Sequence, residues 1–388
     1  MTAWDWLKPE LDRLRDQQLF RRVREVTSLP DAWCVVEGRK LRNFAGNDYL
    51  NLSHDPRVIE AACVVAKEAG TGSAASALVC GRTPWHAALE TQLAQFKGEE
   101  AAILFPTGYA ANLGTLAALA GAEDLVLCDR LNHASLVDGC RLSGAKFRVF
   151  RHDDLPGLEA QLHKAARFRR RLIVTDSVFS MDGDVAPLSE LCALAERFDA
   201  LLIVDEAHAT GLFGDLGRGI AEAQGVAGRV SVSIGTLSKA LGGLGGFVAG
   251  PTDLIDFLRN HARTQMFSTA LPPAQCAAAS AALRIIQAEP QLRQVLLKGA
   301  AGFAQTLRDA GLNMGGQPAG PIIPVLLNDP AKALAVAREL ESVGFLVAAI
   351  RPPTVPQGTS RLRITLTTAT AGEPSQVLAD QLKQMRLA

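Results

Sequence analysis

The sequence predicts an α/β protein with two domains: a large one, with a mostly parallel central sheet between helices, and a smaller α+β domain at the C-terminal end. Short apolar runs alternate with helical stretches between residues 101 and 250, which is typical of parallel strands joined by right-handed crossovers. The runs 172–176 (LIVTD) and 201–205 (LLIVD) do not alternate with polar residues, as expected for central strands covered on both faces. The length of 388 residues suits two such domains.

The N-terminal part is expected to form a helix followed by a hairpin. Apolar residues recur near the helical period, so we predict an amphipathic helix over 4–28 from Leu7, Leu11, Leu14, Leu19 and Val23. Residues 33–44 are predicted to form two short strands that turn at Glu37-Gly38.

The large domain is predicted to contain alternating strands and helices. The strand-like runs, the first of which ends in a turn, are 101–109, 124–129, 147–152, 171–180, 200–208, 230–238 and 245–250. The helical stretches between them are 111–120, 133–144, 155–168 and 187–199. An Ala-rich helix within 270–287 is expected to join this domain to the next one.

The C-terminal part combines helices around 297–311 and 330–343 with strands at 322–327, 345–350 and 361–366. This pattern fits a smaller α+β domain. We therefore predict three parts: an N-terminal helix with short strands (1–45), a large ligand-binding domain (46–285) and a small C-terminal domain (286–388).

Composition excludes several classes of protein. Forty Lys and Arg residues balance forty Asp and Glu residues, so the net charge offers no electrostatic footprint for nucleic acid or an anionic membrane, and the alternative is a local basic patch. No apolar run reaches about 18 residues, and the charged N-terminus does not resemble a secretory signal. Seven cysteines without a C-x-x-C pair indicate reduced thiols. We expect a cytoplasmic enzyme.

Asp205 and Lys239 are the most informative pair of polar residues. Each ends an apolar, strand-like run, and ligands of open α/β sheets bind beyond the carboxyl ends of the strands. A lysine that reacts with an aldehyde must lose a proton, and a carboxylate can keep a pyridine nitrogen protonated. Taken alone, the two residues are more often an exposed lysine and a helix-capping aspartate.

A phosphate seat is predicted next to this pair. Thr107-Gly108-Tyr109 ends a strand and opens a helix, whose free N–H groups favour an anion. Thr236 offers a hydroxyl three residues before Lys239, and glycines at 242–246 allow the main chain to pass close by. The alternative is an ordinary glycine-rich turn that binds no phosphate. A P-loop, a dinucleotide fingerprint and a β-lactamase-like site are disfavoured because their motifs are absent.

Two histidines could complete the site. The ring of one could stack on a cofactor and the other could hydrogen-bond its phenolic oxygen, and the candidates are His133 and His208. Each alone is more often a capping or core residue. A helicase reading of D-E-A-H (205–208) lacks a phosphate loop, and a zinc site of His133, His208 and Cys128 lacks local ligand spacing. We expect no metal.

The segment 350–366 leads from a proline-rich stretch into a strand that carries Arg361 and Arg363. Arginine suits bidentate binding of a carboxylate. The alternative is a stiff loop with solvated arginines.

With these residues assembled, the chain resembles the α-oxoamine synthases, a family of fold-type I transferases that use pyridoxal 5'-phosphate (PLP). The resemblance runs from about Arg21 to about Leu366. It rests on N-D-Y-L (47–50), T-G-Y-A-A-N (107–112), R-L-N-H-A-S (130–135), F-S-M-D-G-D (179–184), D-E-A-H-A-T-G (205–211), T-L-S-K-A-L-G-G (236–243) and I-R-P-P-T-V-P-Q-G-T (350–359). The last motif favours the acyltransferases of biotin biosynthesis over the relatives that make aminolevulinate, aminoketobutyrate or ketosphinganine.

The resemblance implies a role for each matching residue. Lys239 would bind the cofactor aldehyde covalently, Asp205 would pair with the ring nitrogen, and His133 would stack on the ring and face the substrate. The implied contacts of the cofactor oxygens are Ser180 and His208, and those of its phosphate are Gly108, Tyr109, Thr236 and, from a partner subunit, Ser268 and Thr269. Arg361 would hold the amino-acid carboxylate, and the other implied substrate-binding residues are Arg21, Asn47 and Thr354.

The resemblance also implies the reaction, a decarboxylating condensation of L-alanine with a pimeloyl thioester of CoA or of a carrier protein, in a homodimer with shared sites. The alternatives are an α-oxoamine synthase that uses glycine or serine, and a non-catalytic subunit, against which Lys239 argues. One stretch departs from the family. Where relatives often have G-S-G-G-S-G, this chain has Gly72-Ser73-Ala74-Ala75-Ser76-Ala77, which puts methyl groups where the resemblance implies that the main chain approaches the substrate.

Overall fold

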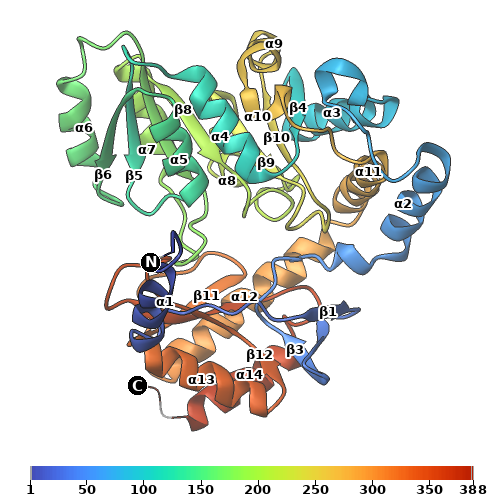
Figure 1. Ribbon diagram of the computed structural model, residues 1–388, viewed down its shortest axis with the longest axis vertical. Coiled ribbons are helices and arrows are strands. Elements are labelled where there is room, and N and C mark those ends of the chain that lie inside the picture. The colour runs from blue at the N-terminus through green and yellow to red at the C-terminus, as the bar shows by residue number, and fades with distance from the viewer. Residues whose placement is uncertain (1, 386, 388) are drawn as a thin grey trace. The chain divides into compact units, whose positions relative to one another are not determined.

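The computed structural model describes residues 2–385 and 387, and these form two compact units (Figure 1). Among the described residues, unit 1 comprises 2–49, 181–184, 295–385 and 387, and unit 2 comprises 50–180 and 185–294. None of the helices within the described residues is long and apolar enough to cross a membrane.

Unit 2 is built on a seven-stranded sheet (Figure 1). Its order is β4 (Ala101–Phe105), β10 (Gly246–Gly250), β9 (Val232–Thr236), β8 (Leu201–Asp205), β7 (Arg171–Asp176), β5 (Leu125–Asp129) and β6 (Lys146–Phe150). Strand β10 pairs antiparallel with β4 and β9, whereas the other pairs are parallel. The predicted, mostly parallel sheet is confirmed, and β10 is its exception.

Helices cover both faces of this sheet. On one face, α4 (Gly108–Leu119), α5 (Ala134–Leu142) and α9 (Thr252–His261) share an apolar core with the strands. The helix α7 (Leu188–Arg197) contacts β8. Every residue of β5 and β9 is buried, which explains why these runs are apolar without alternation. The remaining short helices of this unit are η1 (Leu52–His54), α6 (Leu155–His163), α8 (Ile220–Ala223), η3 (Ala227–Arg229) and α10 (Arg263–Met266).

Several helices of unit 2 were not predicted, and besides the shorter α8, α9 and α10 these include two longer helices. They are α2 (Pro56–Ala69) and α3 (Pro84–Lys97), and both pack on α11 (Pro273–Ala288). Their start signals are nevertheless present, because each has a proline in its first turn. The Asp55 carboxylate caps α2, and Thr83 forms a capping box with His86 at the start of α3.

An exposed apolar surface lies where two segments of unit 2 meet. One turn of π-helix, η2 (Ala77–Gly81), carries Leu78 and Val79, which are 62% and 78% exposed, and the exposed thiol of Cys80. Phe267 follows α10, which contacts η2, and is 68% exposed. We call Leu78, Val79 and Phe267 the π-turn patch.

Unit 1 contains two small sheets. An antiparallel sheet has the order β11 (Ile322–Asn328), β14 (Ser360–Thr365), β13 (Ala348–Ile350), and α13 (Pro330–Ser342) packs against all three strands. The second sheet has the order β1 (Val26–Leu29), β2 (Trp33–Val36), β3 (Arg39–Asn43), β12 (Phe345–Leu346). The single strand predicted over 345–350 is therefore two strands in different sheets. The other helices are α12 (Gln291–Asp309) and α14 (Glu373–Gln384), of which α14 was not predicted.

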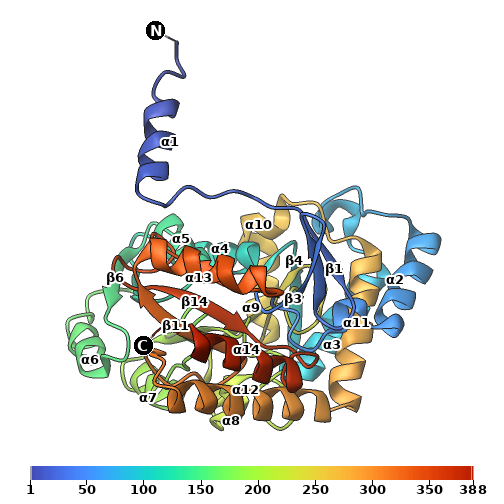
Figure 2. The same cartoon turned by 90° about the horizontal axis from the view of Figure 1, so that it is seen from below.

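The prediction of a helix over 4–28 is wrong in its length. Helix α1 spans Leu7–Asp16, and the chain continues as an extended segment to β1 (Figure 2). Gln18 has φ +56°, a left-handed conformation through which an α-helix does not continue. No residue of α1 is buried. The apolar spacing thus continued past the point where the backbone leaves the helix.

Candidate active site

The predicted cofactor residues follow strands that run in the same direction. Strands β5, β7 and β8 are parallel to one another and to β9, and β4 shares this direction because β10 is antiparallel to both β4 and β9. The carboxyl ends of these strands therefore lie at one edge of the sheet, where ligands of such folds bind. Asp205 ends β8, Thr236 ends β9, and His133 follows β5 at the start of α5.

The Asp205 carboxylate is buried and held at both oxygens. Only 5% of the residue is exposed. The Asn112 side-chain amide donates to Oδ2 at 2.6 Å, and the Ala207 N–H donates to Oδ1 at 2.7 Å. The N–H and hydroxyl of Ser177 donate to the main-chain carbonyl of Asp205. Its orientation is thus fixed before any ligand binds.

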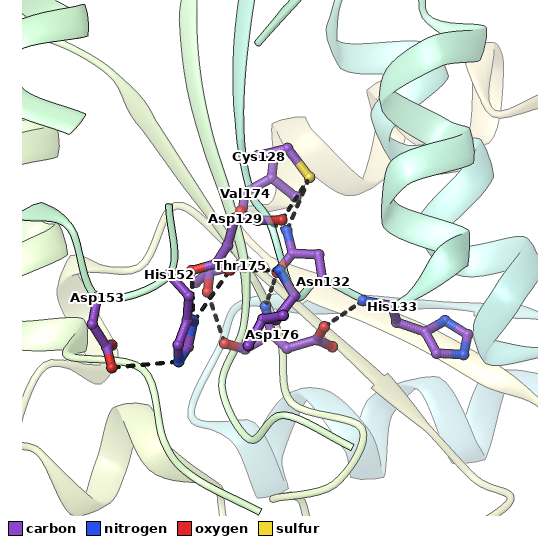
Figure 3. Close-up of polar contacts among 10 residues, drawn as sticks. Cys128, Asp129, Asn132, His133, His152, Asp153, Val174, Thr175 and Asp176 are labelled. Carbon is purple, nitrogen blue, oxygen red and sulfur yellow. Dashed lines mark hydrogen bonds and ion pairs between the residues drawn. The ribbon is translucent and has the colours of Figure 1, made fainter. Parts of the chain in front are cut away.

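His133 is the N-cap of α5 and is held from two sides. Its N–H donates to Asp176 Oδ2 at 2.6 Å, and Asp176 in turn contacts Asn132 through its own N–H (Figure 3). The Ser135 hydroxyl lies 2.7 Å from His133 Nδ1. Tyr109 meets the imidazole edge-on, with the ring centroids 6.3 Å apart.

The electrostatic neighbours of His133 include Asp205 and Lys239. Desolvation by the surrounding protein lowers the pKa of His133, the charge of Lys239 acts in the same direction, and Asp205 opposes both. Burial and the neighbouring Asp205 raise the pKa of Asp176 well above its usual range, against the opposing effect of Lys239. The structure therefore brings the predicted pair, Asp205 and Lys239, to one edge, together with His133.

The start of α4 forms a cradle with the end of β9. Thr107 caps the helix, its hydroxyl accepting the Ala110 N–H at 3.0 Å. The first N–H groups of a helix have no partner within it. A Cβ on Gly108 would lie 3.1 Å from Thr236 Oγ1, and one on Gly246 would lie 2.4 Å from the Thr107 carbonyl. Only glycine lets these three segments approach so closely.

The D-E-A-H stretch divides into residues with different surroundings. His208 is buried three residues after Asp205. The Glu206 carboxylate accepts the N–H groups of Ile220 and Ala221 at 3.0 and 2.9 Å, at the start of α8. Glu206 is thus a structural cap. Ser180 is half-buried in the segment after β7.

Ser268 and Thr269 lie beside the loop 72–77, which departs from the family pattern, and not at the carboxyl ends of the strands. Thr269 forms an isolated bridge with Ser76, and the next N–H donates to the Ala75 carbonyl at 3.0 Å. Ala74 in this loop has φ +55°, a conformation that favours glycine. The stretch therefore keeps a glycine-like backbone although the residue is alanine.

The predicted substrate residues form two groups within unit 1. Arg361 is 4% exposed and pairs with Asp182, while its Nη1 also donates to the Met181 carbonyl at 3.1 Å. Its Nη2 donates to no acceptor among the described residues. The Asn47 side chain accepts from Arg363 at 3.1 Å.

The second group joins the segment after α1 to the proline-rich stretch. Arg21 donates to Thr354 Oγ1 at 3.2 Å and to the Pro352 carbonyl at 3.3 Å. Both Arg21 and Thr354 are exposed, so these hydrogen bonds compete with water and leave the guanidinium accessible.

Sequence reasoning missed three residues that support the site, namely Asn112, Ser135 and Asp176. Asp176 ends the apolar run of β7 in the same way as Asp205 ends β8, so the signal was available. Asn112 and Ser135 lie on α4 and α5 and are buried. Their role depends on a contact between two helices, which spacing along the chain does not reveal.

The residues present fit PLP. Gly108 and Thr236 offer a phosphate seat at a helix N-terminus. Asp205 supplies a fixed, buried carboxylate for the ring nitrogen, and Lys239 is half-buried on the same edge of the sheet. A flat, phosphorylated pyridine aldehyde matches this set of donors and acceptors.

Comparison with known proteins agrees with this chemistry. The profile of the family "Aminotransferase class I and II" matches residues 39–380. The 8-amino-7-oxononanoate synthase of Anaeromyxobacter dehalogenans is 49% identical over 95% of this chain and 92% of its own length. For 8-amino-7-oxononanoate synthase 2 of Bacillus subtilis, the identity is 46% over 95% of this chain and 94% of the relative.

Solved structures show the same fold. The serine palmitoyltransferase of Sphingomonas wittichii superimposes with a TM-score of 0.93 at 34% identity, over 99% of this chain and 97% of that one. An 8-amino-7-oxononanoate synthase from Francisella tularensis gives a TM-score of 0.74 at 27% identity, over 89% and 99% of the two chains. This chain therefore has the fold of the fold-type I PLP transferases, and it belongs to the class I and II aminotransferase family and, within it, to the 8-amino-7-oxononanoate synthases.

Proposed function

We propose that this protein condenses L-alanine with a pimeloyl thioester to give 8-amino-7-oxononanoate, CO2 and a free thiol, a step of biotin biosynthesis. The new bond joins the alanine α-carbon to the thioester carbonyl carbon, while the thiol leaves and the alanine carboxylate departs as CO2. The observation that carries the proposal is the convergence of Asp205, Lys239 and His133 on the edge that also holds the Gly108–Thr236 cradle.

When bound, PLP supplies an aromatic ring that accepts the electron pair released at the α-carbon. Lys239 Nζ would hold the cofactor, and its free amine would take the proton from the alanine α-carbon as the general base. Asp205 orients the ring nitrogen, His133 stacks on the ring and contacts the substrate, and His208 and Ser180 bind its oxygens. The phosphate is bound by Gly108, Tyr109 and Thr236.

The amino-acid carboxylate is assigned to Arg361. Its guanidinium is buried and keeps Nη2 uncommitted to the described protein groups, which suits a carboxylate. Asn47, Arg21 and Thr354 are assigned to the acyl substrate, carried by CoA or by a carrier protein.

The working form is proposed to be a cytoplasmic homodimer with shared sites. The π-turn patch supports this, because large apolar side chains exposed together mark an interface. Ser268 and Thr269 directly follow Phe267 of this patch, where they would reach the phosphate bound by the partner subunit.

A second candidate is an α-oxoamine synthase with another amino acid, such as serine. The TM-score of 0.93 to a serine palmitoyltransferase favours it, whereas the higher identity to the oxononanoate synthases, 46–49%, argues for alanine.

The deciding experiment measures product and thiol release with alanine and pimeloyl-CoA, with glycine and acetyl-CoA, and with serine and palmitoyl-CoA. We expect 8-amino-7-oxononanoate from the first pair only. Lys239→Ala should abolish turnover and the borohydride-sensitive visible absorption of the bound cofactor, whereas Lys298→Ala, at an exposed lysine of α12, should change neither. Normal turnover by Lys239→Ala would refute the assignment.

A further inference from the structure

The carboxylate of Asp205 and the imidazole of His133 are joined by a continuous chain of hydrogen bonds. Asn112 Nδ2 lies 2.6 Å from Asp205 Oδ2 and 2.9 Å from Ser135 Oγ. Ser135 Oγ lies 2.7 Å from His133 Nδ1. Asn112 is 2% exposed and Ser135 is fully buried, so water does not compete for these contacts.

The chemistry of the groups fixes the direction of the chain. A carboxylate only accepts, so one Nδ2 proton of Asn112 points to Asp205 and the other is directed to Ser135 Oγ. The Ser135 hydroxyl therefore uses its own proton toward His133 Nδ1. The Ser135 main-chain N–H also faces this nitrogen, at 3.3 Å. His133 Nδ1 is thus an acceptor, and the neutral ring carries its proton on Nε2.

We propose that Asn112 is a positioning residue that uses its two amide protons to orient Asp205 and, through Ser135, to hold His133 as the Nε2–H tautomer. This inference rests on the proposed function for the importance of Asp205 and His133. Asn112 Oδ1 is buried and has no partner among the described residues. The side chain therefore leaves its acceptor unsatisfied so that both donors can serve the site.

Other charged groups around this chain come from three elements. Lys239 follows β9, Asp176 ends β7, and Asp138 lies on α5. None of them makes a hydrogen bond to Asn112 or Ser135 within the described residues. A change at Asn112 should therefore reach the cofactor through Asp205.

The first test follows the pH midpoint of the visible absorption band of the holoenzyme. Asn112→Leu removes both donors and keeps the branched shape of the side chain. With Asp205 less well held, the ring nitrogen retains less positive charge, so the nitrogen of Lys239 that carries the cofactor becomes more basic. We expect the midpoint to rise by about one pH unit and kcat to fall at least tenfold with KM for alanine changed less than threefold.

Two controls separate positioning from general damage. Thr115→Val, on the same helix, removes a buried hydroxyl that has no partner among the described residues, and should leave the midpoint unchanged. In an Asp205→Ala background, Asn112→Leu should add no further shift, because contributions that act through one group are not additive. An unchanged midpoint in folded Asn112→Leu, or a full shift in the double variant, would overturn the role of Asn112.

The second test observes the tautomer of His133 directly in the wild-type protein. Nitrogen-15 NMR of the imidazole rings, with His133→Gln to assign the signal, should show His133 in wild type as the Nε2–H tautomer, with or without cofactor. Ser135→Ala should populate the other tautomer. An Nδ1–H signal in wild type would refute the inference. Absence of a visible band in purified wild type would instead refute the proposed function and leave this result standing.

Discussion

At the scale of single residues, Ala74 shows how a departure from the family pattern is accommodated. Its φ of +55° puts the backbone in the left-handed region, which costs a residue with a Cβ about 1–2 kcal/mol. The conformation persists because the loop is fixed on both sides. Ser73 Oγ donates to the Leu271 carbonyl at 2.6 Å, and the Ala75 carbonyl accepts the Ala270 N–H.

Replacing Ala74 by glycine should therefore stabilise the protein. The strain relieved exceeds the extra backbone entropy of glycine in the unfolded chain, so we expect the free energy of unfolding to rise by about 0.5–1 kcal/mol. Urea denaturation would measure it. Ala75→Gly is the matched control, because Ala75 has no positive φ. Its free energy of unfolding should be lower than that of wild type or unchanged. A less stable Ala74→Gly protein would contradict the strain argument.

At the scale of elements, Asp124 forms hydrogen bonds at the point where the strands β5, β6 and β7 begin. Its fully buried carboxylate accepts from Arg169 and Arg170, which precede β7, at 2.9–3.3 Å. Its carbonyl accepts the Lys146 N–H, at the start of β6, and β5 begins at the next residue. Burial alone would raise the pKa of Asp124, but the two arginines and the Gly121 N–H lower it overall.

Asp124→Asn should lower the free energy of unfolding at pH 7 by about 1.5–3 kcal/mol, as for hydrogen bonds to a charged group. Because the folded-state pKa of Asp124 is lowered, its contribution is complete above the unfolded value of about 4 and is lost as the pH falls toward the folded one. The difference between wild type and variant should thus shrink below pH 4 in denaturation curves measured from pH 7 to 3. Glu123→Gln, at an exposed neighbour, should show no measurable change, and a constant difference at all pH values would contradict the linkage.

Elements could be predicted where the sequence pattern matched their environment. The continuously apolar strands β5, β7 and β8 were found because both of their faces are buried. The end of α1 was not found, because it depends on the backbone of Gln18 rather than on apolar spacing. Within the site, strand ends identified Asp205 and Lys239, but the contact between Asn112 and Ser135 joins two helices and has no signal in spacing.

At the scale of the whole molecule, the π-turn patch predicts self-association. Wild type should have twice the mass of one chain in light scattering after gel filtration, and Leu78→Asp or Phe267→Asp should shift it to one chain, because a buried unpaired carboxylate is costly at an interface. Leu142→Asp is the control, since Leu142 is 63% exposed at the end of α5, outside the patch. A wild-type monomer at micromolar concentration would exclude the dimer.

The thiol of Cys80 gives this surface a chemical reporter. Of the seven cysteines, only Cys63 and Cys80 are exposed in the single chain, and Cys80 lies next to Val79 in η2. Since a thiol reacts only where the reagent can reach it, alkylation kinetics distinguish the two states without any substitution. Two fast-reacting sulfhydryls per polypeptide would indicate a lone subunit. One would indicate a pair of subunits whose contact shields Cys80.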